Sequence, residues 1–240
     1  MEIGQVQAAL RHLVAKHGTV DAAQMMTALT ACSKSTVSRG GSMKQLWETV
    51  KLLEEAGGRP NLMAATRVLQ TTVKLAGFGR AVPKDGLEIL DWALESDLHV
   101  DTVMLSLAMD ICAKAAGHGK ASLDDARGVL QYAKGLTSKP EPNVVTFTSM
   151  IDVCAKAGGY NKAQPQDGDW VMDAMRKAGV AGNTKTYTAL LSFYANTANR
   201  RKDPLQDGWA VVEEMKGLGV NVTAGTMNAL IVLCGKAARA

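Results

Sequence analysis

The chain has 240 residues, of which 47% are hydrophobic, 21% charged and 5% aromatic, and its formal net charge is +4. This composition excludes an intrinsically disordered chain, and no run approaches the roughly 18 uncharged apolar residues that a membrane helix needs. The excess of positive charge indicates a nucleic-acid partner only if the cations gather on one surface. Charged residues such as Glu2 and Arg11 interrupt the first twenty positions, so these predict neither a secretory signal nor a transit peptide.

The four cysteines mark one position of an internal repeat. Cys112 and Cys154 each open the sequence Cys-Ala-Lys-Ala and are 42 residues apart, while Cys32 and Cys234 each stand 80 residues from the nearer of these two. None belongs to a Cys-x-x-Cys pair, so the cysteines predict neither a disulfide framework nor a zinc site, and they indicate a reducing compartment. We expect them to be small buried hydrophobic residues.

This repeat divides the chain into units of 40 or 42 residues. The predicted boundaries are 1–21 for the second helix of a partial unit, 22–61, 62–101, 102–143, 144–183 and 184–223 for five full units, and 224–240 for the first helix of a further partial unit. A unit of this size cannot bury its apolar face alone, so neighbouring units must stack on one another.

Each full unit is predicted to contain two helices. In the unit from 144, the first helix carries apolar residues at the i, i+3, i+4, i+7 spacing of one buried stripe, namely Phe147, Met150, Ile151 and Cys154. The second helix begins near a recurring Asp-Gly pair and ends at a glycine such as Gly179. The four tryptophans lie in these second helices, where we expect them to anchor the core. The sequence therefore predicts an all-α fold, a right-handed α-solenoid of stacked helix-turn-helix units.

The unit from 144 resembles a known family. The residues Asn143-Val-Val-Thr-Phe-Thr-Ser-Met-Ile-Asp-Val-Cys-Ala-Lys-Ala-Gly158, followed by Asp173-Ala-Met-Arg-Lys-Ala-Gly179-Val, are closely similar to the pentatricopeptide repeat, a helical hairpin that binds single-stranded RNA. The unit from 184 resembles it nearly as well, those from 102 and 224 moderately, and those from 22 and 62 weakly. The units here are longer than is typical of the family, and the extra residues fall between the two helices, where added length costs little.

The resemblance implies that each unit recognises one RNA base through the fifth residue of its first helix and the last residue before the next unit. We call these two residues a reading pair. The implied pairs are Thr66 with Asp101, Ser106 with Asn143, Thr148 with Asn183 and Thr188 with Thr223, and Asn228 is a fifth residue whose partner would lie beyond residue 240. The second residue of the helix would pack on the base, and the aliphatic residues at that position are Met63, Val103 and Val145.

The chemistry of the reading pairs implies a base for several units. A carboxylate only accepts hydrogen bonds and suits the donor edge of guanine, whereas an amide both donates and accepts and suits adenine. By the code of the family, the pair of Thr66 and Asp101 implies guanine and the next two pairs adenine, which gives a 5′-GAA core. The pair of Thr188 and Thr223 is chemically ambiguous, and Asn228 implies a pyrimidine.

Lysines recur at one phase near the end of the first helix, and we expect each to neutralise one phosphate. They are Lys34, Lys74, Lys114, Lys156 and Lys236. The elongated loops add further cations, among them Lys120, Lys162 and Arg201, which either widen the basic edge of the RNA groove or are ordinary solvated residues.

The leading hypothesis is therefore a sequence-selective single-stranded RNA-binding array, with protein partners on its outer face or flanking segments. The main alternative is a protein-binding scaffold of the tetratricopeptide type, which shares the helical hairpin but has a Trp, Leu-Gly and Tyr pattern that is absent here. No nucleophile, base and orienting group recur together, so we expect no catalysis, cofactor or metal within the chain, and any appended enzyme would lie outside it. Similar proteins act mostly in the mitochondrion or chloroplast, which the resemblance implies as the location.

Overall fold

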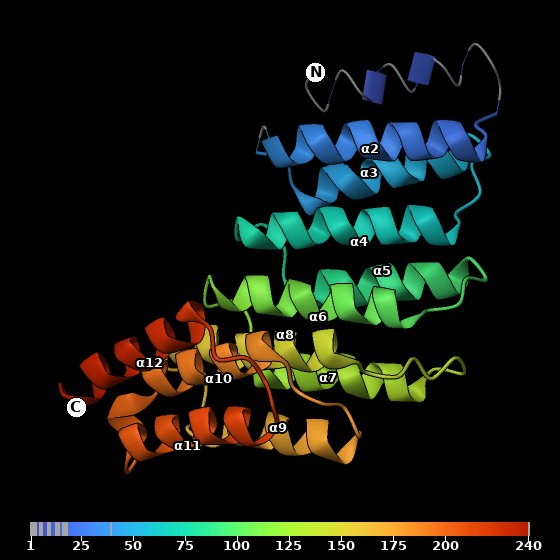
Figure 1. The fold of residues 1–240 in the computed structure, drawn as a ribbon. Coiled ribbons are helices and arrows are strands. Elements are labelled where there is room, and N and C mark those ends of the chain that lie inside the picture. The colour runs from blue at the N-terminus through green and yellow to red at the C-terminus, as the bar shows by residue number, and fades with distance from the viewer. Residues whose placement is uncertain are drawn as a thin grey trace.

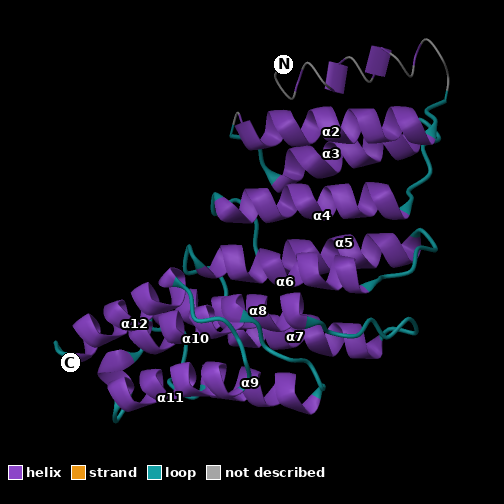
Figure 2. Ribbon diagram, in the orientation of Figure 1, coloured by secondary structure: helices purple, strands orange, loops and turns teal. Residues whose placement is uncertain are grey.

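The computed structural model describes residues 19–38 and 40–239, together with Gly4, Gln7, Ala8, Arg11, His12 and Ala15. The helix predicted over residues 1–21 therefore lies largely outside the described residues. Within the described part of the chain all regular structure is helical, as Figure 2 shows.

The helices alternate between a first and a second helix of each unit. The first helices are α2 (Ala22–Ser38), α4 (Leu62–Gly77), α6 (Thr102–Ala116), α8 (Val144–Gly158), α10 (Thr184–Asn196) and α12 (Ala224–Ala237). The second helices are α3 (Met43–Glu55), α5 (Pro83–Glu95), α7 (Leu123–Gly135), α9 (Asp167–Lys177) and α11 (Pro204–Gly217), and a short 3-10 helix spans Ala198–Arg200. Each first helix begins at the residue where a unit was predicted to begin.

The helices form two layers. In the first-helix layer, α2 packs on α4, α4 on α6, α6 on α8, α8 on α10 and α10 on α12, so each first helix contacts the first helix of the next unit. The second helices pack against this layer and form the second-helix layer (Figure 1). The predicted all-α solenoid is confirmed. Among the described residues, no helix combines the length and the apolar character that spanning a bilayer requires.

Side-chain caps set where all six first helices begin. Each cap is the last residue before the helix, and its side-chain oxygen accepts a hydrogen bond from a backbone N–H of the first turn. The capping residues are Asp21, Asn61, Asp101, Asn143, Asn183 and Thr223. Asn, Asp and Thr are favoured at this position because they satisfy N–H groups that the helix leaves unpaired. The second members of the predicted reading pairs are therefore also helix caps.

In two of the three Asp-Gly pairs, the aspartate bonds the backbone at the start of the second helix. Asp85 Oδ2 accepts a hydrogen bond from the backbone N–H of Val82 at 2.7 Å, and Asp167 Oδ2 accepts one from the N–H of Gln164 at 2.7 Å. In the third pair Asp207 forms an ion pair with Arg201, and Asp203 caps the helix instead. A carboxylate in the first turn also interacts favourably with the helix dipole.

The glycine of the pair lets the second helix approach the first helix of the next unit. A Cβ on Gly168 would lie 2.5 Å from Cδ1 of Phe193, which is fully buried on α10. A Cβ on Gly208 would overlap the side chain of Leu233 on α12 in the same way. At Gly86 the nearest atom is the flexible tip of Ile111, at 3.1 Å. These contacts bring the two layers together.

The cysteines lie where the repeat placed them. Cys32, Cys112 and Cys154 are buried in the first-helix layer, Cys234 is half-buried, and all four are free thiols. Burial raises the pKa of Cys112 to about 12, so its thiol is protonated at neutral pH. The described residues contain no group of His, Cys, Asp or Glu that could hold a metal ion.

The tryptophans divide into two classes. Trp47 and Trp92 are half-buried and pack edge to face with ring centroids 5.8 Å apart. Trp170 and Trp209 are exposed on the second-helix layer, and the guanidinium of Arg127 lies 4.2 Å from the centroid of the Trp170 ring. The expectation that all four anchor the core is wrong for these last two, because their helices turn the indole outward.

Candidate RNA-binding interface

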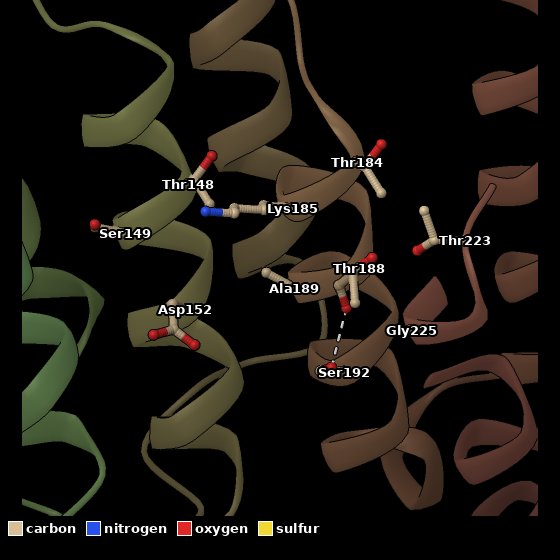
Figure 3. Close-up of a pocket in the computed structure, with 10 residues that line it drawn as sticks. All are labelled: Thr148, Ser149, Asp152, Thr184, Lys185, Thr188, Ala189, Ser192, Thr223 and Gly225. Atoms are coloured by element: carbon tan, nitrogen blue, oxygen red, sulfur yellow. Dashed lines mark hydrogen bonds between the residues drawn. The ribbon is translucent and has the colours of Figure 1, made fainter. Parts of the chain in front are cut away.

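Members of the last two complete reading pairs line a hollow on the first-helix layer. A space of about 490 Å³ lies between α8, α10 and the start of α12. Figure 3 shows that its lining includes the fifth residues Thr148 and Thr188, the last residue Thr223, and Lys185 extending across it. A second hollow of about 410 Å³ lies at the other end of the layer, over Met26 and Lys34 of α2. Residues from the same repeat positions therefore form one surface.

Aliphatic side chains stand exposed along this surface. Met63, Val103 and Val145 are 65%, 55% and 54% exposed, although most other apolar residues of their helices are buried or half-buried. They occupy the same position in three successive units. Exposed apolar residues that recur at one repeat position indicate a binding surface. In the next two units the position holds Lys185 and Gly225.

A buried threonine joins the two members of the pair Ser106 and Asn143. The hydroxyls of Ser106 and Thr146 lie 3.1 Å apart, and the Thr146 hydroxyl donates to Asn143 Oδ1 at 3.3 Å. Thr146 is the third residue of the next unit and is completely buried. The pair is thus held by a bridge from the neighbouring helix.

The next two units repeat this bridge. Thr148 and Thr186 hydroxyls lie 2.7 Å apart, and the Thr186 hydroxyl donates to Asn183 Oδ1 at 3.2 Å. For the pair of Thr188 and Thr223, the bridging hydroxyl belongs to Thr226, at 3.1 Å from the first and 3.2 Å from the second. Both bridging threonines are completely buried. We call Thr146, Thr186 and Thr226 the bridging threonines.

The pair of Thr66 and Asp101 has no such bridge. The residue in the bridging position is Met104, and the Thr66 hydroxyl donates instead to the carbonyl of Leu62 at 2.8 Å. Asp101 Oδ1 accepts from the backbone N–H of Met104 at 2.8 Å. Asn228 is exposed, with no hydrogen-bond partner for its side chain among the described residues.

The five lysines of the predicted phosphate ladder do not share one environment. Lys34 and Lys74 are exposed, and their ammonium groups have no partner within the described part of the chain. Lys236 is exposed and donates to Asn196 Oδ1 at 2.5 Å. The first two are therefore the most available to an anion.

The other two lysines lie beside carboxylates. Lys156 Nζ is 2.6 Å from Asp152 Oδ2. Burial raises the pKa of Asp110, the charges of Lys114 and Lys156 act against this shift, and the charge of Asp152 adds to it. The middle of the surface consequently carries two carboxylates as well as two ammonium groups.

Most loop cations hold the loops to one another. Lys120 Nζ donates to the carbonyl of Gly79 at 2.7 Å, and Lys162 Nζ donates to that of Gly119 at 2.6 Å. The side chain of Arg201 is 7% exposed and forms ion pairs with two carboxylates. Each lysine thus caps the loop of the preceding unit, a role that the sequence did not indicate, and the elongated loops stack as the helices do.

Comparison with known proteins now defines the family. The family model described as the pentacotripeptide-repeat region of PRORP matches residues 80–240, which is more than half of the chain. The chain belongs to the pentatricopeptide-repeat family. No curated protein matches the sequence.

Solved pentatricopeptide-repeat structures share the fold of the chain. PRORP2 from A. thaliana, a nuclear proteinaceous RNase P, has a TM-score of 0.62 at 18% identity over 90% of this chain and 43% of its own. The repeat domain of Arabidopsis thaliana PRORP1, solved with tRNA, gives 0.55 at 15% identity, over 89% of this chain and 98% of its own. PPR10, solved with an 18-nt psaJ RNA element, gives 0.55 at 21% identity, over 98% and 32%. The chain thus spans less than half of the PRORP2 and PPR10 structures.

Two features of this pentatricopeptide array escaped the sequence analysis. The bridging threonines recur at the third position of three successive units, a pattern that an alignment of the units displays. Asp110 and Asp152 each precede a ladder lysine by four residues, a spacing that favours ion pairing along a helix. Both signals were present but were not connected with the groove.

Proposed function

We propose that this chain binds single-stranded RNA along the first-helix layer, with one base at each reading pair. The observation that carries the proposal is the row of exposed aliphatic residues, Met63, Val103 and Val145, each next to a polar pair. An aliphatic platform packs on a base of any kind, while the polar pair supplies hydrogen bonds to its edge. The related domains solved with tRNA and with the psaJ RNA element support this proposal.

The hydrogen-bonding groups of the unit from 62 suit guanine. Thr66 uses its proton on the carbonyl of Leu62, so the hydroxyl offers only lone pairs outward. The Asp101 carboxylate is also an acceptor. Two neighbouring acceptors complement the N1–H and amino donors of guanine.

The next two pairs suit adenine. The amide oxygens of Asn143 and Asn183 accept from backbone N–H groups, so each side chain directs its NH2 group outward. A donor beside a hydroxyl complements the ring nitrogen and amino group of adenine. With the first unit at the 5′ end of the RNA, the proposed core is 5′-GAA, followed by an unspecified base and then a pyrimidine at Asn228.

The biological role proposed for the array is in the processing, stability, editing or translation of transcripts in the mitochondrion or chloroplast. The chain would act by occupying its RNA site, without catalysis of its own. The exposed Trp170 and Trp209 on the second-helix layer provide a surface for protein partners.

The first test is selection from a randomised single-stranded RNA pool at two salt concentrations, with a DNA pool in parallel. Enrichment of a 5′-GAA core in RNA alone is the expected result. Binding without sequence preference would remove the base-by-base part of the proposal, and absence of binding to any pool would favour the protein-binding scaffold.

A second test changes Thr66, Ser106 and Thr148 to alanine together. We expect affinity for the selected RNA to fall about a hundredfold, since each lost hydrogen bond contributes about 1 kcal/mol. The matched control changes Ser96 and Thr137, which lie just beyond the ends of the second helices α5 and α7, and should leave affinity unchanged. Equal affinities of the triple variant and this control would show that Thr66, Ser106 and Thr148 do not contact RNA.

A further inference from the structure

We propose that Thr146 and Thr186 set the direction of hydrogen bonding in the reading pairs they bridge, so that each pair distinguishes amino bases from keto bases. This inference rests on the proposed function, since it concerns how the same surface recognises RNA. It assigns a specificity role to residues that are completely buried and touch no base. The threonines are positioning residues, and their effect passes through the two side chains they join.

The orientation of the Asn143 amide fixes one end of the bridge. Its Oδ1 accepts from the backbone N–H of Val145 at 2.9 Å and from that of Thr146 at 3.1 Å. Because backbone N–H groups only donate, the atom that faces them must be the amide oxygen. The Nδ2 group, for which the described residues offer no partner, points outward as a donor.

The Thr146 hydroxyl has one proton and two acceptors within reach, Asn143 Oδ1 at 3.3 Å and the Ser106 hydroxyl at 3.1 Å. In the proposed arrangement this proton goes to Asn143 Oδ1, which cannot donate, and Ser106 donates across the 3.1 Å contact. Ser106 is left with lone pairs toward the groove, so this pair presents an acceptor at Ser106 and a donor at Asn143.

Thr186 imposes the same order on the next pair. Asn183 Oδ1 accepts from two backbone N–H groups and lies 3.2 Å from the Thr186 hydroxyl. In the proposed arrangement Thr186 donates to Asn183, and Thr148 donates across the 2.7 Å contact. Thr226 cannot do this, because its partner Thr223 is a hydroxyl that both donates and accepts. The third bridge therefore does not decide which member of its pair presents a donor and which presents an acceptor.

The bridges are not needed to stack the helices. Helix α2 packs on α4 and α4 packs on α6, yet the bridging positions of those contacts hold Ala64 and Met104. Neither residue carries a hydroxyl. The threonines that follow each complete a capping box, because their hydroxyls accept from the backbone N–H of the cap residue, and the same hydroxyls also contact the neighbouring pair.

A fixed order of acceptor and donor separates two classes of base. Adenine and cytosine carry an amino donor beside a ring-nitrogen acceptor, and guanine and uracil carry the opposite arrangement, a carbonyl beside a ring N–H. A base of the second class in the same pose places acceptor against acceptor at Ser106 and donor against donor at Asn143. The bridge should therefore control the preference for adenine over guanine, while purine and pyrimidine are distinguished by size.

The experiment compares Thr146→Val, which has nearly the same shape without a hydroxyl, with Thr146→Ser, which keeps the hydroxyl. Dissociation constants are measured for four RNAs that differ only at the base facing Ser106. In Thr146→Val the ratio of guanine to adenine dissociation constants should fall about three- to tenfold, as expected for one misdirected hydrogen bond. The ratio of cytosine to adenine should change less than twofold, and Thr146→Ser should keep both ratios.

Thr72→Val is the matched control, because Thr72 is completely buried in α4 and its hydroxyl bonds the carbonyl of Val68, outside any reading pair. It should leave the preferences at every base unchanged, and thermal melts establish that all variants are folded. A folded Thr146→Val protein that keeps the wild-type guanine-to-adenine ratio overturns the inference alone. A wild-type chain that binds RNA with no preference at this base, or binds none, overturns the proposed base recognition and the inference with it.

Discussion

The units before and after residue 102 have the same architecture but differ along the edge that faces the groove. In both regions the first helices pack on one another and begin at side-chain caps. In the units that begin at 102, 144 and 184, a buried threonine of the following unit contacts the reading pair, whereas the earlier units have no such threonine. The difference teaches that stacking does not depend on the bridging threonines, since the solenoid forms with Ala64 and Met104 where the later units have threonine.

The largest effect is expected from breaking what the two regions share, the close contact between the layers. Gly168→Ala should lower the free energy of unfolding by about 1–3 kcal/mol, because the new methyl group would overlap the buried ring of Phe193. Gly86→Ala should cost less, since the tip of Ile111 can move. Urea denaturation of each variant measures these changes.

Gly128→Ala provides the matched control for those substitutions. Gly128 is exposed in α7 with no atom within 4 Å of an added Cβ, so alanine should raise the free energy of unfolding by roughly 0.5–1 kcal/mol through helix propensity. A Gly168→Ala protein as stable as Gly128→Ala would mean that the layer contact is looser than the structure indicates.

The second prediction sharpens the comparison between bridged and unbridged caps. Asn61→Ala should cost about 1 kcal/mol, the usual value for loss of a helix cap. Asn143→Ala loses the cap and also leaves the buried Thr146 hydroxyl without its acceptor, so it should cost up to about 1 kcal/mol more. Thermal and urea unfolding compare the two, and a smaller loss for Asn143→Ala would contradict the bridge.

The architecture was predictable because its signals are local and repeated. The cysteine period placed the first residue of each first helix, and the Asp-Gly pairs placed the second helices close to where they begin. The exposure of Trp170 was not predictable in the same way, since it depends on which face of α9 turns toward α10.

The site was only partly predictable, because one residue type serves two purposes. Asn143 and Asn183 were assigned to base recognition from family resemblance, and the structure shows that they also cap helices. The bridge joins three side chains from two units, so no single unit displays it. The ladder lysines share one repeat position, which predicts one environment for all of them. Only Lys114 and Lys156 have an aspartate four residues earlier, so their environments differ from the others.

The third prediction tests the exposed lysines at the start of the array. Changing Lys34 and Lys74 to alanine together should reduce the dependence of log affinity on log salt by about 1.4, since each phosphate contact on a single strand contributes roughly 0.7. Affinity should fall about tenfold for all RNA sequences alike, because phosphates carry no sequence information. Titrations at several salt concentrations measure the slope, and a loss confined to one sequence would exclude phosphate contact.

The smallest effect concerns the carboxylates that distinguish the middle of the surface from its start. Changing Asp110 and Asp152 to asparagine together should strengthen RNA binding about two- to fivefold at neutral pH, because two negative charges leave the groove and Lys156 loses its ion pair. In this double variant, Lys34→Ala and Lys74→Ala should each reduce RNA affinity by the same factor as in the wild type, since they lie in other units.

The pH dependence of RNA binding, compared between the wild type and Asp110→Asn, separates the effect of the Asp110 charge from that of its shape. Burial raises the pKa of Asp110, so the folded chain binds this proton more tightly than the unfolded chain, and its free energy of unfolding rises as pH falls through the raised pKa. RNA affinity should rise over the same interval in the wild type as Asp110 loses its charge. In Asp110→Asn this part of the rise should disappear, and a wild-type profile that matches the variant would show that the Asp110 charge does not act on the RNA.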